Sequence, residues 1–191
     1  MDNLEPAMNR RHMTLPMSQS EAKELRAGDL LLLSGPIYTA RDAAHARLVE
    51  LDAAGTPLPI DLEGETIYYA GPCPAPPGQV IGSVGPTTSG RMDRYAPRLM
   101  ELGLRAMIGK GLRSQTVVES MKKHGAVYLG ATGGAGALIA GCVREATVIA
   151  FPELGAEAIR RLVVEDLPVV VLIDSEGNDL YAQGRARYRR D

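Results

Sequence analysis

Two threonines and an arginine stand close together near the middle of the chain, at Thr87, Thr88 and Arg91. Threonine hydroxyls donate single hydrogen bonds, and the arginine guanidinium offers a two-pronged fork that matches a carboxylate. An apolar run over residues 80–84 predicts a strand before them, and a helical pattern begins after Asp93. Such a turn places side chains at the carboxyl edge of a sheet, where open α/β folds bind ligands. The stretch therefore predicts a site for a small carboxylate; a capped turn with a solvated Arg91 is the alternative.

Two more cations occupy the same kind of place. Arg41 and Lys110 each follow a predicted strand, and Lys110 lies between glycines that let the backbone approach a ligand closely. A cation in the first turn of a helix, as expected for Arg41, opposes the helix dipole and is better suited to holding an anion. A harmless exposed arginine and a plain surface turn are the alternatives. If these strands are neighbours, their cations converge on one positive pocket that suits a substrate with two carboxylates.

These residues need a framework of alternating strands and helices. Thr39 and Asp42 match a capping box, which predicts a helix that runs to about Ala54. His45 shares a face of this helix with Arg41, and we expect it to make a structural hydrogen bond rather than to act as a base. The alternation predicts a single α/β domain with a layered sheet. The expected strands also cover residues 30–33, 66–70, 105–108, 126–129, 147–151 and 168–173, and the other helices cover 93–102, 114–123, 137–143 and 153–161.

The chain of 191 residues is long enough for one domain with a buried core. Residues 1–27 are polar and methionine-rich, and they predict an N-terminal lead-in or a short edge element. The domain is expected over residues 28–180, and residues 181–191 are expected to form a basic tail.

Composition excludes several classes of protein. A net charge of −2, one phenylalanine and no tryptophan argue against a nucleic-acid binder, which needs basic surface and aromatic rings for stacking. No apolar run is long enough to span a bilayer, so no membrane association is expected. The N-terminus lacks the order of a signal peptide, and Cys73 and Cys142 are isolated, which excludes a disulfide framework and a zinc motif. We therefore expect a cytoplasmic location.

Four motifs in this order carry a family resemblance. They are residues 35–45 (GPIYTARDAAH), 85–93 (GPTTSGRMD), 109–111 (GKG) and 151–159 (FPELGAEAI). Together they resemble the C-terminal domain of class I fumarate hydratase, which occurs as a separate β subunit in two-subunit enzymes. The related L-tartrate dehydratase β subunit shares much of the pattern. The resemblance extends over residues 28–178, nearly the whole chain.

The resemblance implies a swivelling β/β/α fold and a role in the reversible hydration of fumarate to (S)-malate. It implies that Arg41, Arg91 and Lys110 bind the substrate carboxylates and that Thr87 transfers a proton at the substrate carbon. Thr88, beside it, is expected to contribute to substrate binding. It further implies a hetero-oligomer, such as a dimer of heterodimers, with an α subunit that carries a [4Fe–4S] cluster on three cysteines.

The cysteine content is consistent with a cluster on the α subunit, because two scattered cysteines, Cys73 and Cys142, cannot supply three thiolates. We therefore expect no metal ligands in this chain and a cluster on the partner. Gly90 before Arg91 and the FPELG segment favour a fumarase over a tartrate or other hydroxy-diacid dehydratase β subunit. A non-catalytic carboxylate-binding module is a third hypothesis, which the four intact residues (Arg41, Thr87, Arg91 and Lys110) disfavour.

Overall fold

The computed structural model describes residues 10–189, which form a mixed α/β fold. The strands are β1 (Arg11–Thr14), β2 (Leu30–Thr39), β3 (Thr66–Tyr68), β4 (Ala106–Gly109), β5 (Val127–Gly130), β6 (Val143–Ala150) and β7 (Ile159–Ile173). The α-helices are α1 (Gln19–Glu24), α2 (Asp42–Ala53), α3 (Ala96–Glu101), α4 (Gln115–His124), α5 (Gly136–Ala140) and α6 (Leu180–Tyr188). Two 3-10 helices, η1 (Ser89–Met92) and η2 (Pro152–Glu157), complete the described elements.

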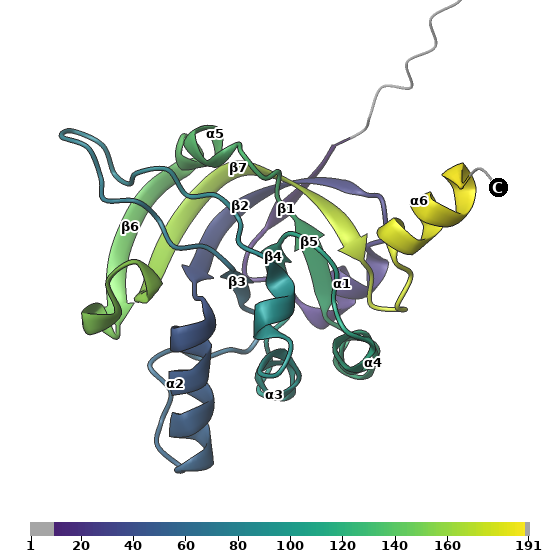
Figure 1. Ribbon diagram of the computed structural model, residues 1–191, viewed down its shortest axis with the longest axis horizontal. Coiled ribbons are helices and arrows are strands. Elements are labelled where there is room, and N and C mark those ends of the chain that lie inside the picture. Colours follow the sequence, from purple (N-terminus) through teal and green to yellow (C-terminus); the bar gives the residue numbers. More distant parts are fainter. Residues whose placement is uncertain (1–9, 190–191) are drawn as a thin grey trace, which may run out of the picture.

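The seven strands form one sheet that closes on itself (Figure 1). β2 pairs with β1 and β3 along one edge and with β7 along the other. β3, β4 and β5 follow in parallel order, and β5 pairs with β7, which completes a barrel. The α/β class predicted from the sequence is confirmed, but the layered sheet is a barrel, because β7 is long enough to pair with both β2 and β5.

Side chains that alternate along the strands face two cores. Ala106 and Ile108 of β4 point into the barrel, whereas Met107 between them joins a second core with Tyr128 of β5. Helices α2, α3 and α4 lie on one side of the barrel and cover this second core (Figure 1). Burial on both faces is what parallel strands require. Because β2, β3, β4 and β5 run in the same direction, their carboxyl ends lie at one edge of the sheet.

The predicted capping box of α2 is wrong. Thr39 is the last residue of β2, and its hydroxyl accepts a hydrogen bond from the Arg160 N–H at 3.3 Å. Arg41 occupies the N-cap position without a side-chain cap of its own. The pairing of Thr39 with both neighbouring strands keeps it extended, so tertiary contacts override the local signal. The predicted end of the helix agrees with the structure, since α2 ends at Ala53.

Two other local predictions are also wrong. Residues 153–161 do not form an α-helix: η2 ends at Glu157 and β7 begins at Ile159, because residues 159–164 pair with β6. Residues 80–84 do not form a strand. The Tyr68 hydroxyl instead donates to the Val84 carbonyl at 2.7 Å, and the Cys73 N–H donates to the Ser83 carbonyl at 2.9 Å.

Both ends of the described region contribute secondary structure. β1 is a short edge strand parallel to β2, and Met13, Leu15 and Met17 are buried in the barrel core. At the other end, residues 180–188 form the exposed helix α6 within the segment expected as a basic tail. The boundaries at residues 28 and 180 stay predictions, and residues 1–9 and 190–191 lie outside the described part. Within residues 10–189, no helix has the length and apolar character needed to cross a membrane.

Candidate functional site at the carboxyl edge of the sheet

The segment with the two threonines lies beside the ends of β3 and β4. The Thr87 N–H donates to the Tyr69 carbonyl at 2.7 Å, just beyond β3, and the Thr87 carbonyl accepts from the Lys110 N–H at 3.3 Å. Thr88 forms an isolated parallel bridge with Lys110. These backbone contacts place Thr87, Thr88 and Lys110 next to one another at the carboxyl edge of the sheet, the position predicted for them from the sequence. Within residues 10–189, neither threonine hydroxyl makes a hydrogen bond.

Arg41 reaches this edge from the end of β2. Its guanidinium lies 3.4 Å from Glu157 Oε1, and both side chains are only 24% exposed. The other oxygen of Glu157 accepts the Ala43 N–H at 3.0 Å and so satisfies a free donor of the first turn of α2. Arg41 Nε is buried and has no partner in the described part of the chain. Glu157 therefore holds the arginine in place, and the buried Nε keeps a donor that no residue between 10 and 189 satisfies.

Arg91 approaches the same end of α2 from the 3-10 helix η1. Its Nη2 contacts Asp42 Oδ2, and Asp42 directly follows Arg41 in the chain. The Arg91 side chain is 48% exposed, so this ion pair is accessible to solvent. The two arginines thus lie on one side of the molecule, at the N-terminal end of α2. An exposed pair of this kind contributes little to stability, which leaves Arg91 free to exchange its carboxylate partner for a ligand.

Lys110 completes the positive edge. It is exposed, and its amine makes no hydrogen bond or ion pair within residues 10–189. Its side chain lies over the turn after β5, where a Cβ added to Gly133 would be 3.7 Å from Nζ. An ammonium group left without a counter-ion at the end of a strand is available for an anion.

His45 lies beneath the edge and is fully buried. Its Nδ1 is 2.8 Å from the Arg41 carbonyl, which can only accept, so Nδ1 carries the proton and the role of structural hydrogen-bond donor expected from the sequence is confirmed. Burial, with a smaller effect from the Arg113 cation, lowers its pKa to about 4. His45 is therefore neutral at pH 7.

Buried polar atoms without partners concentrate at this place. Nine buried side-chain nitrogen or oxygen atoms lack a hydrogen bond among the described residues 10–189. Five of the nine belong to residues at the edge or in the layer beneath it: Arg41, Asp42, His45, Tyr69 and Arg113. Since buried polar groups are nearly always hydrogen-bonded, such a concentration indicates a place where water or a ligand completes the network.

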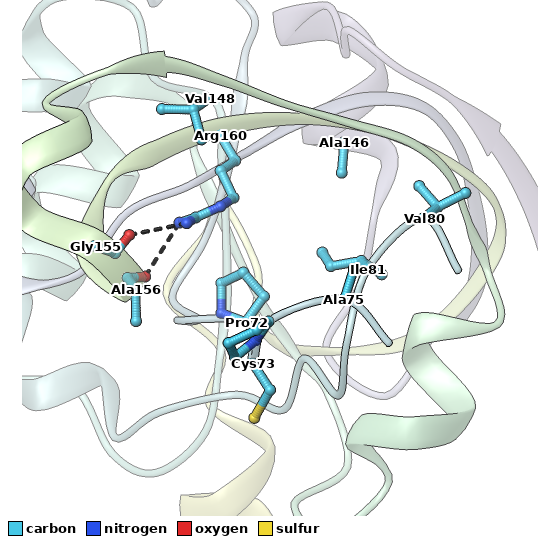
Figure 2. A pocket seen from close by; sticks show the side chains of 11 residues that line it. Pro72, Cys73, Ala75, Val80, Ile81, Ala146, Val148, Gly155, Ala156 and Arg160 are labelled. Atoms are coloured by element: carbon cyan, nitrogen blue, oxygen red, sulfur yellow. Dashed lines mark hydrogen bonds between the residues drawn. The ribbon is translucent and has the colours of Figure 1, made fainter. Parts of the chain in front are cut away.

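A groove that η2 helps to line has a different character (Figure 2). It has a volume of about 380 Å³ and is lined mostly by prolines, alanines and valines of residues 72–80, β6 and η2. Its one guanidinium, of Arg160, points at the carbonyls of Gly155 and Ala156 and donates to them at 2.9 and 3.4 Å. The Cys73 side chain points away from Arg160 (Figure 2). Among residues 10–189, the lining of the groove carries no charge that is free to bind a diacid.

The carboxylates that hold the arginines, Asp42 and Glu157, were not among the site residues predicted from the sequence. Asp42 and Glu157 lie within the recognised motifs, and each lies in a segment that folds against a cation from another motif. Asp42 directly follows Arg41 in the sequence, but its partner could not be predicted, because Asp42 contacts Arg91 rather than its neighbour Arg41. Such crossed pairs depend on how the turns meet in space.

The described residues do not fit a metal centre of their own. Between Arg10 and Arg189 there is no group of three or more His, Cys, Asp or Glu side chains that could hold a metal ion. Cys73 and Cys142 are both free thiols.

Comparisons with known proteins give consistent matches. A family model described as "Fumarase C-terminus" matches residues 2–184. "Fumarate hydratase class I, aerobic" of Escherichia coli (strain K12) is 46% identical over 155 residues, or 80% of this chain and 28% of that protein. "Fumarate hydratase 2" of Leishmania major is 41% identical over 167 residues, or 86% of this chain and 29% of that protein. "Putative L(+)-tartrate dehydratase subunit beta" of Methanocaldococcus jannaschii is 37% identical over 173 residues, covering 87% and 89%. The chain thus spans less than a third of these fumarate hydratases and most of the tartrate dehydratase subunit.

Proposed function

The chain belongs to the fumarase C-terminus family, and we propose that it is the diacid-binding β subunit of a hydro-lyase that interconverts fumarate and (S)-malate. The observation that carries this proposal is the positive carboxyl edge: Arg41 and Arg91 lie at the N-terminal end of α2, and Lys110 lies beside Thr87 and Thr88, whose hydroxyls make no hydrogen bond within residues 10–189. The names of relatives such as the Escherichia coli enzyme support fumarate as the substrate.

In this proposal the cations bind and orient the diacid. The Arg91 fork and the Lys110 ammonium hold carboxylate oxygens, Arg41 adds a second guanidinium that is partly exposed, and Thr88 donates a hydrogen bond. Charge-assisted hydrogen bonds contribute about 1.5–3 kcal/mol each once water is excluded. When a proton leaves the carbon beside a carboxylate, negative charge spreads onto that carboxylate, and fixed cations stabilise it.

Thr87 is the proposed proton-transfer residue. Its hydroxyl is a weak base, and within residues 10–189 no carboxylate accepts a hydrogen bond from it. We therefore assign the activating group to the partner subunit. The Thr87 backbone is fixed by hydrogen bonds on both sides, to Tyr69 and Lys110, so the hydroxyl has a defined position at the edge.

A [4Fe–4S] cluster of the class I type does not fit this chain. Cluster ligation needs more thiolates than Cys73 and Cys142 provide. We assign the cluster to an α subunit in a cytoplasmic hetero-oligomer, such as a dimer of heterodimers, and the fold to the swivelling β/β/α type. The subunit name of the Methanocaldococcus jannaschii relative, most of which this chain covers, supports a separate partner.

L-tartrate, or another hydroxy-diacid, is the second candidate substrate. The match that covers 89% of the tartrate dehydratase subunit favours it. The same cations would hold both carboxylates of tartrate, whose extra hydroxyl needs one more hydrogen-bond partner at the site.

Anaerobic co-expression with a cluster-bearing α subunit tests the proposal. The purified complex is assayed on fumarate, (S)-malate and L-tartrate, and the chain alone is the control. We expect the complex to hydrate fumarate and the isolated chain to be inactive. Full hydratase activity of the isolated, iron-free chain would refute the shared site. Turnover of tartrate with no turnover of fumarate would identify L-tartrate as the substrate. Absence of both activities would support the third hypothesis, a non-catalytic carboxylate-binding module.

A further inference from the structure

A buried ion pair joins the turn that carries Arg91 to the turn that carries Lys110. Arg113 Nε donates to Asp93 Oδ1 at 2.7 Å, and the Ser114 N–H donates to Asp93 Oδ2 at 2.6 Å. The Arg113 side chain is completely buried and that of Asp93 is 16% exposed. Asp93 follows η1 directly, and Arg113 follows Lys110 by three residues. Both oxygens of one carboxylate are therefore used to bridge the two turns.

Tyr128 of β5 makes a second link between the same turns. Its hydroxyl lies 2.8 Å from Ser89 Oγ and 3.0 Å from the Gly111 carbonyl. Because a carbonyl can only accept, Tyr128 donates to Gly111 and the Ser89 hydroxyl donates to Tyr128. Ser89 and Tyr128 are both fully buried. The hydroxyl therefore has a partner in each turn.

The two turns also pack directly against each other. A Cβ added to Gly109 would lie 2.0 Å from Ser89 Oγ, so only glycine fits at the first position of the Gly-Lys-Gly motif. The Ser89 N–H donates to the Lys110 carbonyl at 2.9 Å. The Arg113 guanidinium lies 5.4 and 5.0 Å from the ring centres of Tyr69 and Tyr128, which fixes its charge between two aromatic faces.

We infer that Asp93, Arg113 and Tyr128 are positioning residues that set the spacing between Arg91 and Lys110, and so the fit of the site to a four-carbon diacid. This inference rests on the proposed function. None of the three has an assigned contact with substrate: each acts through the turn that it holds. Misplacing a substrate-binding group by about 1 Å can lower the catalytic rate by about 100-fold. Loss of the ion pair or of the Tyr128 hydrogen bonds beneath two such groups should therefore have a large effect on activity.

Arg113→Lys in the assembled complex is the main test, because lysine keeps the charge and loses the fork to Asp93. Arg105→Lys is the matched control. Arg105 is also a buried arginine, is paired with Glu63 at 3.2 Å, and precedes β4 at the end opposite Lys110. We expect both variants to be less stable. Only Arg113→Lys should raise KM for the diacid and lower kcat, with a fall in kcat/KM of about tenfold or more.

Hydrogen exchange provides a readout that does not depend on activity. In Arg113→Lys, the amides of residues 87–93 and of residues 109–114 should lose protection together, whereas in Arg105→Lys both segments should keep it. Kinetic constants of Arg113→Lys that match those of Arg105→Lys, or loss of protection in only one of the two segments, would overturn the inference.

Tyr128→Phe provides a second test if Arg113→Lys does not fold. Phenylalanine keeps the ring and removes the hydroxyl that joins Ser89 to Gly111, and we expect a fall in kcat/KM of about three- to tenfold. Unchanged kinetic constants in this variant would count against the inference. If the wild-type complex turns over no diacid at all, the proposed function fails, and the exchange experiment decides separately whether the two turns are coupled.

Discussion

The positive carboxyl edge and the apolar groove both contain arginines, but the arginines are used differently. In the groove, Arg160 donates to the carbonyls of Gly155, Ala156 and Ala158, so backbone carbonyls close to it in sequence satisfy the donors of its guanidinium. At the edge, Arg91 pairs with an accessible carboxylate and Lys110 has no partner within residues 10–189. A guanidinium bound to carbonyls near it in sequence supports a fold, whereas one paired with an exchangeable carboxylate can bind a ligand. Mutations at the two places should therefore affect different properties.

Arg91→Ala should have the largest effect. We expect kcat/KM of the assembled complex to fall by about 100- to 1,000-fold, as for loss of one group that stabilises transition-state charge. Because the Arg91 side chain is half exposed and its ion pair contributes little, the melting temperature should change by no more than about 2 °C. Steady-state kinetics and thermal unfolding measure the two quantities.

Arg144→Ala is the control for this variant. Arg144 on β6 is also half exposed and pairs with Glu165 at 2.6 Å, so the same charge is removed away from the edge. Its kinetic constants should match those of the wild type. An Arg91→Ala complex with near-normal kinetics would remove Arg91 from the site and with it the contrast between edge and groove.

The edge could be predicted from the sequence because it depends on local patterns. Arg41 and Lys110 follow the strands β2 and β4, and the parallel order of β2, β3 and β4 brings their carboxyl ends to one edge. Arg91 follows a segment that forms no strand, and the bridge between Thr88 and Lys110 holds its turn at the same edge. The pairing of each cation could not be predicted. Arg91 contacts Asp42, about fifty positions away, and Arg41 contacts Glu157, more than a hundred away. Those contacts depend on the closed barrel, which no local pattern indicates.

Contacts between segments far apart in the sequence also explain why two local predictions were wrong. The pattern of residues 153–161 favours a helix, but residues 160 and 161 pair with both β6 and β2, and residue 159 pairs with β6. Residues 80–84 are apolar enough for a strand, but hydrogen bonds from the Tyr68 hydroxyl and the Cys73 N–H, and one from the Val84 N–H to the Gly136 carbonyl, hold them instead. Non-local pairing overrides propensity in both segments.

Arg160→Ala should give the opposite result to Arg91→Ala. It removes three hydrogen bonds from a charged group to the backbone between η2 and β7, and we expect the free energy of unfolding to fall by about 1.5–3 kcal/mol. Turnover per folded complex should remain within about twofold of the wild type, because the side chain does not reach the edge. Urea unfolding and active-site-normalised kinetics test this. A loss of kcat/KM comparable to that of Arg91→Ala would mean that the groove belongs to the site.

The edge and the groove also differ in what lies beneath them. His45 supports the edge from within the core, whereas the lining of the groove contains no histidine or carboxylate. Burial and, to a smaller extent, the Arg113 cation lower the pKa of His45, while the Arg41 carbonyl and Asp42 oppose the shift, and the resulting pKa is about 4. In the unfolded chain the pKa is near 6.5. Below pH 6.5 the unfolded state therefore binds a proton that the folded state does not, and acid destabilises the fold.

Comparison of the wild type with His45→Gln measures this effect. From pH 7 to pH 5 the wild type should lose about 2 kcal/mol more of its free energy of unfolding than the variant does, because only the wild type carries the imidazole. The stability is fully present above pH 6.5 and is lost progressively down to about pH 4. Urea unfolding at the two pH values gives the difference, and carboxylates common to both proteins cancel. Equal losses in the two proteins would mean that His45 is not buried as a neutral group beneath the edge.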